Sequence, residues 1–190
     1  MRKVERRSFL QGAMITFPLA GFQGALTGFA QTLPVTGQGA QFVAAGADRL
    51  GEPHKGPRAQ SHLDFKIATQ DTNGGLFLLE HTNMTRGGPP RHLHYEQEEW
   101  FYLIEGGEVV MEIGQEKLRL KPGDCVLAPR KVPHAWAYIG ENPGRMILAC
   151  APAGKMEAFF IATSKPGNHL GDAQLMREHG MELIGPPLLT

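Results

Sequence analysis

The sequence has few cysteines and no extended basic region, and both absences narrow the class of protein. Its 190 residues include two cysteines, Cys125 and Cys150, too few for a disulfide framework or a zinc knuckle. One disulfide between them is an alternative, but two buried free thiols are favoured, because cysteine is often a small core residue. Basic residues form no run beyond the first seven positions, and the formal net charge is zero. We therefore expect no nucleic-acid partner.

An unbroken apolar run of about 20 residues, the length that crosses a membrane as a helix, is also lacking. The most apolar segment, 13–30, is interrupted by three glycines and a proline, and it follows a basic start that contains Arg6 and Arg7. It ends in Gly28-Phe29-Ala30, a small-residue site of the kind cleaved after a signal peptide. The letters RRSFLQ from Arg6 onward resemble a twin-arginine export signal.

Residues 1–30 are therefore predicted to be a twin-arginine-like signal peptide. An ordinary secretory signal and an uncleaved anchor are the alternatives. The prediction places the mature protein in the periplasm or outside the cell, with no stable membrane insertion after cleavage. Glycine and proline are frequent, with 24 and 14 residues, so turns are expected to outnumber long helices.

The mature chain divides into three segments. Residues 31–60 show little periodicity and are predicted to be an N-terminal arm or linker. Residues 61–153 alternate short apolar segments with turn signals, which favours an antiparallel sandwich or barrel. Residues 154–190 contain two helical patterns and are predicted to be a short C-terminal helical extension. The expected strands are 62–69, 75–82, 98–105, 108–113, 116–120, 124–128, 134–139 and 145–151.

A cluster of histidine and glutamate precedes one of the apolar strands, in the stretch RHLHYEQEEWFYLIEGG. Burying imidazoles and carboxylates is costly unless something compensates, and a metal ion is the first candidate. His92 and His94 point the same way in a strand, because alternate residues share a face. Glu99 is an odd number of residues from His94, so a turn or bulge over 95–98 is needed to aim it inward. His134, from a later strand, supplies a fourth ligand.

These residues resemble the two short motifs of the cupins. In the first, His92-Leu93-His94 is followed after four residues by Glu99 and, six residues later, by Gly106. In the second, Gly123, Pro129 and His134 stand at the required distances. Two positions depart from the second motif, with Lys131 in place of a glycine and Tyr138 in place of asparagine, and Arg86 replaces the leading glycine of the first motif.

The resemblance implies an all-β fold, a single antiparallel jelly-roll barrel of the cupin type. It also implies one divalent transition metal, either Fe, Mn, Ni, Cu or Zn, held by His92, His94, Glu99 and His134. Glu96 and Glu98 are predicted to be solvated loop charges, since only Glu99 has the motif's spacing to Gly106. A homodimer is expected on the same grounds.

The longer run is similar to the bacterial quercetin-dioxygenase-like cupins. That resemblance implies a dioxygenase that uses O2 on an enolisable or phenolic ring compound, with Glu99 as the catalytic proton acceptor. Phe101, Leu103, Trp136 and Tyr138 are the candidate pocket wall, and His81 is weighed both as a partner of the site and as an ordinary strand residue. A non-catalytic periplasmic binding or sensor protein and a metal-assisted isomerase are the alternatives.

Overall fold

The computed structural model describes residues 39–51, 54–56 and 60–188, and the account below concerns these residues. The predicted signal peptide with Arg6 and Arg7, and the first part of the predicted arm, lie outside them. Within the described part, no helix is both long enough and apolar enough to cross a membrane. Both cysteines are free thiols, as the sequence favours, but only Cys150 is buried; Cys125 is exposed, which corrects the expectation that both lie in the core.

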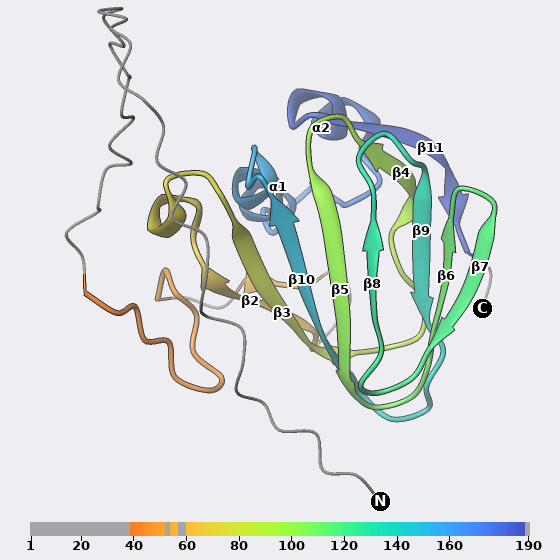
Figure 1. Ribbon diagram of the computed structural model, residues 1–190, viewed down its shortest axis with the longest axis horizontal. Coiled ribbons are helices and arrows are strands. Elements are labelled where there is room, and N and C mark those ends of the chain that lie inside the picture. Colours follow the sequence, from red (N-terminus) through yellow and green to blue (C-terminus); the bar gives the residue numbers. More distant parts are fainter. Residues whose placement is uncertain (1–38, 52–53, 57–59, 189–190) are drawn as a thin grey trace, which may run out of the picture. The chain divides into compact units, whose positions relative to one another are not determined.

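Two antiparallel sheets form the barrel (Figure 1). The six-stranded sheet has the order β1-β2-β3-β10-β5-β8, and the five-stranded sheet has the order β11-β4-β9-β6-β7. The strands of the first sheet are β1 (His54–Lys55), β2 (His62–Ile67), β3 (Phe77–Met84), β10 (Gly144–Ala151), β5 (Glu98–Glu105) and β8 (Cys125–Ala128). Those of the second are β11 (Met181–Pro187), β4 (Pro90–His94), β9 (His134–Tyr138), β6 (Val109–Ile113) and β7 (Glu116–Leu120). The predicted jelly-roll fold is confirmed.

Alternation along the strands builds the core between the two sheets. In β5, Glu99, Phe101 and Leu103 are buried while their neighbours in the strand are partly exposed. In β3, Phe77, Leu79 and His81 are likewise buried on one face. This period of two is the expected pattern for a sheet with one face on the core. The polar members of these buried rows are His81 and Glu99.

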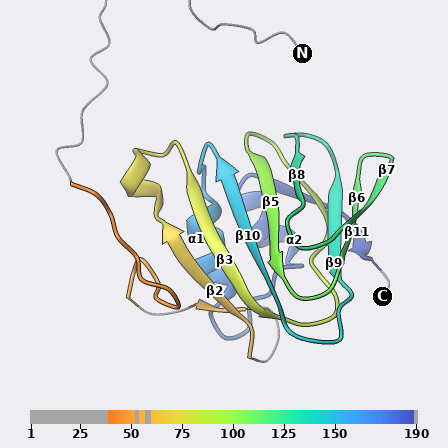
Figure 2. The same ribbon diagram turned by 60° about the horizontal axis from the view of Figure 1, so that its bottom comes forward.

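Two α-helices follow β10, and one short 3-10 helix lies earlier in the described part of the chain. The short 3-10 helix η1 (Thr69–Thr72) lies between β2 and β3, and the α-helices are α1 (Met156–Thr163) and α2 (Ala173–Glu178). Figure 2 shows α1 behind β2, β3 and β10. It packs its apolar face on the barrel interior, where the rings of Phe77 and Phe160 are stacked with centroids 6.0 Å apart. We call residues 156–178 the helical cap.

The helical pattern predicted over 154–190 describes only part of that segment, because its last residues form β11. This strand pairs with β4, with Met181 opposite His94 and Leu183 opposite His92. It contains Pro186 and Pro187, which suit a strand at a sheet edge. The pairing partner is about 90 residues away in the sequence, so local pattern alone does not reveal it. β11 covers the edge of the strand that carries two candidate metal ligands.

Part of the predicted arm is also attached to the barrel. Arg49 donates two hydrogen bonds to Asp71 of η1, at 3.0 and 2.7 Å, and Asp48 accepts a hydrogen bond of 2.6 Å from the backbone N–H of Phe65. β1 pairs with β2. β1 therefore extends the six-stranded sheet, and residues 48 and 49 are bonded to the barrel rather than only linking to it.

Candidate metal centre

Three strands from both sheets bring the four predicted ligands together. His92 and His94 lie on β4, His134 lies directly opposite His92 on β9, and Glu99 lies on β5 in the other sheet. The chain bends at 95 and 96 between β4 and β5. This turn carries the chain from one sheet to the other and aims Glu99 inward, as its odd spacing from His94 requires. All four side chains are buried.

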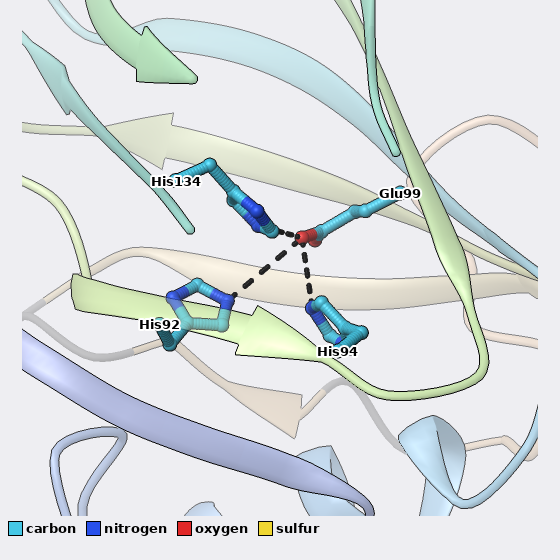
Figure 3. Close-up of side chains that lie close together, drawn as sticks. All are labelled: His92, His94, Glu99 and His134. Carbon is cyan, nitrogen blue, oxygen red and sulfur yellow. Dashed lines mark hydrogen bonds and ion pairs between the residues drawn. The ribbon is translucent and has the colours of Figure 1, made fainter. Parts of the chain in front are cut away.

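One carboxylate oxygen is the centre of the cluster (Figure 3). Oε2 of Glu99 lies 3.0 Å from Nε2 of His134, 3.1 Å from Nε2 of His94 and 3.9 Å from Nε2 of His92. One ligand atom from each of the four residues lies within 4.8 Å of the others. Three imidazole nitrogens that face a single carboxylate form a compact set of donors for one cation.

Backbone carbonyls orient two of the rings. Nδ1–H of His92 donates to the carbonyl of Pro90 at 2.8 Å, and Nδ1–H of His134 donates to the carbonyl of Val132 at 3.1 Å. Because each Nδ1 is engaged in this way, Nε2 of each ring is aimed at the centre. Carbonyls that hold the outer nitrogen of a histidine are a regular feature of metal sites.

The protonation states also suit a metal ion. Burial raises the pKa of Glu99, but hydrogen bonds from His134 and His94 outweigh it and hold the pKa of this carboxyl well below its usual range. Burial lowers the pKa of His92 to about 3, and the nearby rings of His134 and His94 add to the effect. At neutral pH Glu99 is therefore a carboxylate and His92 a neutral imidazole, the forms that bind metals.

Other potential ligands nearby are excluded by their surroundings. The carboxylate of Glu98 is bound by Arg130 in two hydrogen bonds of 2.5 Å on the outer face, and Glu96 is exposed. Cys150 lies opposite Glu99 on β10, but burial, together with the charge of Glu99, raises the pKa of its thiol well above the usual value. The residues present fit a divalent transition metal with three nitrogen ligands and one oxygen ligand.

A cavity of about 60 Å³ adjoins the cluster. His92 and Glu99 line it, so the cavity borders the candidate metal site. Its remaining walls come from the barrel interior, the segment before β4 and the helical cap. The barrel side contributes Ser61, Leu63, His81, Thr85, Gly87, Gly88, Pro89, Trp136 and Leu148, and the C-terminal segment contributes Met156, Phe159, Phe160, Leu170, Met176 and Met181.

The predicted pocket residues separate into two groups. Trp136 lines the cavity, whereas Phe101, Leu103 and Tyr138 are fully buried and are not among its lining residues. Tyr138 is held by its hydroxyl, which accepts a hydrogen bond of 2.6 Å from the N–H of Gly107 and donates one of 2.5 Å to the carbonyl of Asn142. These three residues therefore do not line this cavity, and their place in a substrate pocket stays a prediction. Alternation gives the inward face of a strand but not the position of a side chain along the barrel axis.

Sequence reasoning did not assign the helical cap to the site. Met156, Phe159 and Phe160 form one apolar helical face in the sequence, and in the structure they cover the cavity together with Met176. The spacing of apolar residues along the helix indicated that one of its faces is buried. Which surface that face contacts depends on the tertiary packing. Three methionines, at 156, 176 and 181, give this wall adaptable side chains.

Comparison with known proteins agrees with this architecture. Residues 82–150, which include all four candidate ligands, match the family model of the cupin domain. The match and the two-sheet jelly roll support assignment to the cupin superfamily. An uncharacterized protein of Methanocaldococcus jannaschii is 40% identical over 60 residues, which cover 32% of this chain and 46% of that protein. The chain thus matches less than half the length of this curated relative.

Solved structures with similar folds share little sequence with the chain. KdgF from Halomonas sp. has a TM-score of 0.48 at 22% identity, covering 60% of this chain and 94% of that one. An RmlC-like cupin from Shewanella frigidimarina has a TM-score of 0.48 at 18% identity, covering 62% and 96%. The Streptomyces nucleoside dehydratase Pac13 has a TM-score of 0.41 at 14% identity, covering 53% and 75%. Similarity at this level does not extend to activity.

Proposed function

We propose that the protein is a metal-dependent dioxygenase that acts with O2 on a small enolisable or phenolic ring compound. The proposal depends on the lining of the cavity. Two candidate metal ligands, His92 and Glu99, form one part of it, and an apolar surface with three aromatic residues forms another. These aromatic residues are Trp136, Phe159 and Phe160. A flat ring in this space would lie beside the ligands. A bound divalent transition metal supplies Lewis-acid and redox chemistry at such a site.

The side chains around the site have separate tasks in this proposal. Glu99 lines the cavity, so it is placed to accept the proton of a substrate hydroxyl. This role requires it to exchange its hydrogen bonds with His134 and His94, because these outweigh the effect of burial and hold its pKa below the usual range. The apolar barrel wall and the helical cap exclude bulk water from the substrate anion, which strengthens its electrostatic interactions. The aromatic side chains provide a surface for the ring.

The size of the cavity restricts the substrate. About 60 Å³ is small beside the roughly 300 Å³ or more of sites for drug-sized ligands. Small one-ring enols and phenols are therefore the first candidates. A flavonol would require the side chains of the cap to move, and the methionines at 156 and 176 are suited to such movement.

An oxygen electrode tests the proposal. The Fe, Mn, Ni, Cu and Zn forms would be supplied with a panel of enolic and phenolic compounds, from single rings to flavonols. We expect O2 uptake by at least one redox-active form, loss of that uptake in Glu99→Gln, and wild-type uptake in Glu98→Gln, whose carboxylate is bound by Arg130 outside the cavity. Compounds that bind without O2 uptake would instead support a binding or sensor protein, and turnover without O2 would support an isomerase.

A further inference from the structure

His81 lies on the same cavity wall as the candidate metal ligands but is not one of them. It belongs to β3, between Leu63 of β2 and Met146 of β10 in the strand register. Its side chain is buried and faces the interior, where it lines the cavity together with His92 and Glu99. A single small molecule in a cavity of about 60 Å³ can therefore touch both the metal ligands and His81.

The surroundings of His81 hold its ring in place. Its two cross-strand neighbours, Leu63 and Met146, are apolar. Its ring meets that of Trp136 edge to face, with centroids 6.0 Å apart and planes at 68°. Trp136 is itself two residues from His134 on β9, so it connects the imidazole of His81 to the strand that carries a candidate ligand. A ring packed in this way cannot turn freely away from the cavity.

The chemistry of the wall makes this imidazole distinctive. Among the described lining residues outside the metal cluster, the polar side chains are those of Ser61, His81 and Thr85, and none is a lysine or arginine. An imidazole ring can take part in hydrogen bonds through both of its nitrogens. It thus suits a hydroxyl or carbonyl on the ligand, and an apolar wall without a lining cation does not suit a second ionised group.

We propose that His81 is a substrate-positioning residue, which hydrogen-bonds the second polar group of a ring compound whose first oxygen is held at the metal centre. The assignment rests on the proposed function, because it takes the metal-bound end of the substrate from there. It adds that the substrate carries two oxygen substituents on one small ring, of which one stays uncharged. A catechol or an enolic ketone carries such a pair of oxygens.

The test separates binding from turnover. The Zn(II) form is used, since zinc has no redox chemistry. Two coloured probes are titrated: 4-nitrocatechol, which has two neighbouring hydroxyls, and 4-nitrophenol, which has one. The proteins are wild type, His81→Phe, His81→Gln and the control His62→Gln, whose histidine lies half-buried on β2 and does not line the cavity. Zinc content and melting temperature are measured for each.

We expect His81→Phe to keep its zinc and to bind 4-nitrocatechol about threefold to tenfold more weakly, the range of one hydrogen bond. Binding of 4-nitrophenol should change little, His81→Gln should recover part of the loss, and His62→Gln should match wild type. If His81→Phe does not fold, His81→Gln is compared with wild type instead. Its binding of 4-nitrocatechol should then weaken more than its binding of 4-nitrophenol.

Two results would overturn the assignment. An equal effect on both probes, or none on either, means that His81 only packs the wall. A wild-type zinc form that binds neither probe means that the cavity does not admit such a ring beside the metal. O2 uptake with the redox-active metals is scored separately, so the dioxygenase proposal and the role of His81 can fail independently.

Discussion

At the scale of single residues, the site depends on one carboxylate among several. Glu99 lies inside the cluster while the adjacent Glu98 points outward to Arg130, because neighbouring residues in a strand face opposite sides. Glu99 and Glu98 therefore serve as a matched test and control for the candidate metal site. The two side chains have the same chemistry and differ in the face of β5 on which they lie.

We predict that Glu99→Gln loses most of the bound metal, since a neutral amide replaces the single anionic ligand. Glu98→Gln should keep the wild-type content. Elemental analysis of both proteins after purification in the same metal-containing buffer checks this. Equal metal content in the two variants would contradict the ligand assignment.

Lys131 is the position at which the sequence departs from the glycine of the second cupin motif. Lys131 replaces the usual glycine, and its φ of +64° lies in the left-handed region that glycine adopts most readily. Its backbone N–H donates a hydrogen bond of 2.7 Å to the carbonyl of His94. The turn keeps the shape that joins it to a candidate ligand, although the residue now in it is strained.

Lys131→Gly is therefore expected to stabilise the protein by about 0.5–1 kcal/mol. This is the difference between roughly 1–2 kcal/mol for a side chain in the left-handed region and roughly 0.5–1 kcal/mol for the extra chain entropy of glycine. Lys131→Ala, which keeps the Cβ, should not stabilise. Urea unfolding of the metal-free proteins measures both. A gain in the alanine variant equal to that in glycine would point to the lysine charge instead.

At the scale of elements, the arm and the barrel are joined through η1. Asp71 accepts hydrogen bonds from the Arg49 guanidinium and from the backbone N–H of Ala68. The hydrogen bonds from Arg49, more than the opposing effect of burial, hold the pKa of Asp71 below its usual value. A carboxyl whose pKa is depressed by folding stabilises the protein above its unfolded pKa, and the contribution is lost as the pH falls through the folded pKa.

Asp71→Asn should consequently lower the melting temperature by a few degrees at pH 7. The difference from wild type should shrink as the pH falls below about 4, the ordinary pKa of aspartate. Thermal melts between pH 3 and 7 test this, with Asp124→Asn as a control for a partly exposed turn carboxylate that accepts a hydrogen bond from the backbone N–H of Lys121. A difference that stays constant across this range would mean that the charge of Asp71 is not what holds the arm.

At the scale of the whole molecule, the candidate ligands come from both sheets. Glu99 belongs to the six-stranded sheet, and the three histidines belong to the five-stranded sheet. An ion held by all four would cross-link the two halves of the barrel. Metal binding and global stability are therefore expected to be linked, because a ligand that binds only the folded state stabilises that state.

We predict that metal raises the free energy of unfolding by about 2.7 kcal/mol at a free concentration one hundred times Kd. Chelation should reverse the gain, and Glu99→Gln should show little response to either treatment. Unfolding curves with and without a chelator measure the change. If the free energy of unfolding of the wild-type protein is the same with and without metal, the result would argue against a metal-binding cluster that spans both sheets.

Export is predicted from residues outside the described part of the chain. If the twin-arginine interpretation is right, changing Arg6 and Arg7 together to lysine should leave the protein in the cytoplasm, and the wild-type mature chain should begin near Gln31. Cell fractionation and N-terminal sequencing check the two statements. Export that survives the double substitution would indicate the general secretory route. The homodimer that the cupin resemblance implies also stays a prediction.

Local patterns determined much of the barrel and the members of the candidate metal cluster. Side-chain alternation predicted eight of the strands, and the spacing of His92, His94, Glu99 and His134 predicted their convergence. These features are readable because a strand has a fixed period of two, and a motif fixes where its strands begin and turn.

Only the tertiary structure decided what surrounds the cluster. It placed Tyr138 away from the cavity, brought Phe159 and Met176 onto its wall, and paired Met181–Pro187 with β4 across about 90 residues of sequence. The hydrophobic effect is non-directional. An apolar helical face therefore predicts that its side chains are buried, but it does not predict which other residues they pack against. The candidate metal ligands follow from local geometry, whereas the shape of the cavity follows from packing between distant segments.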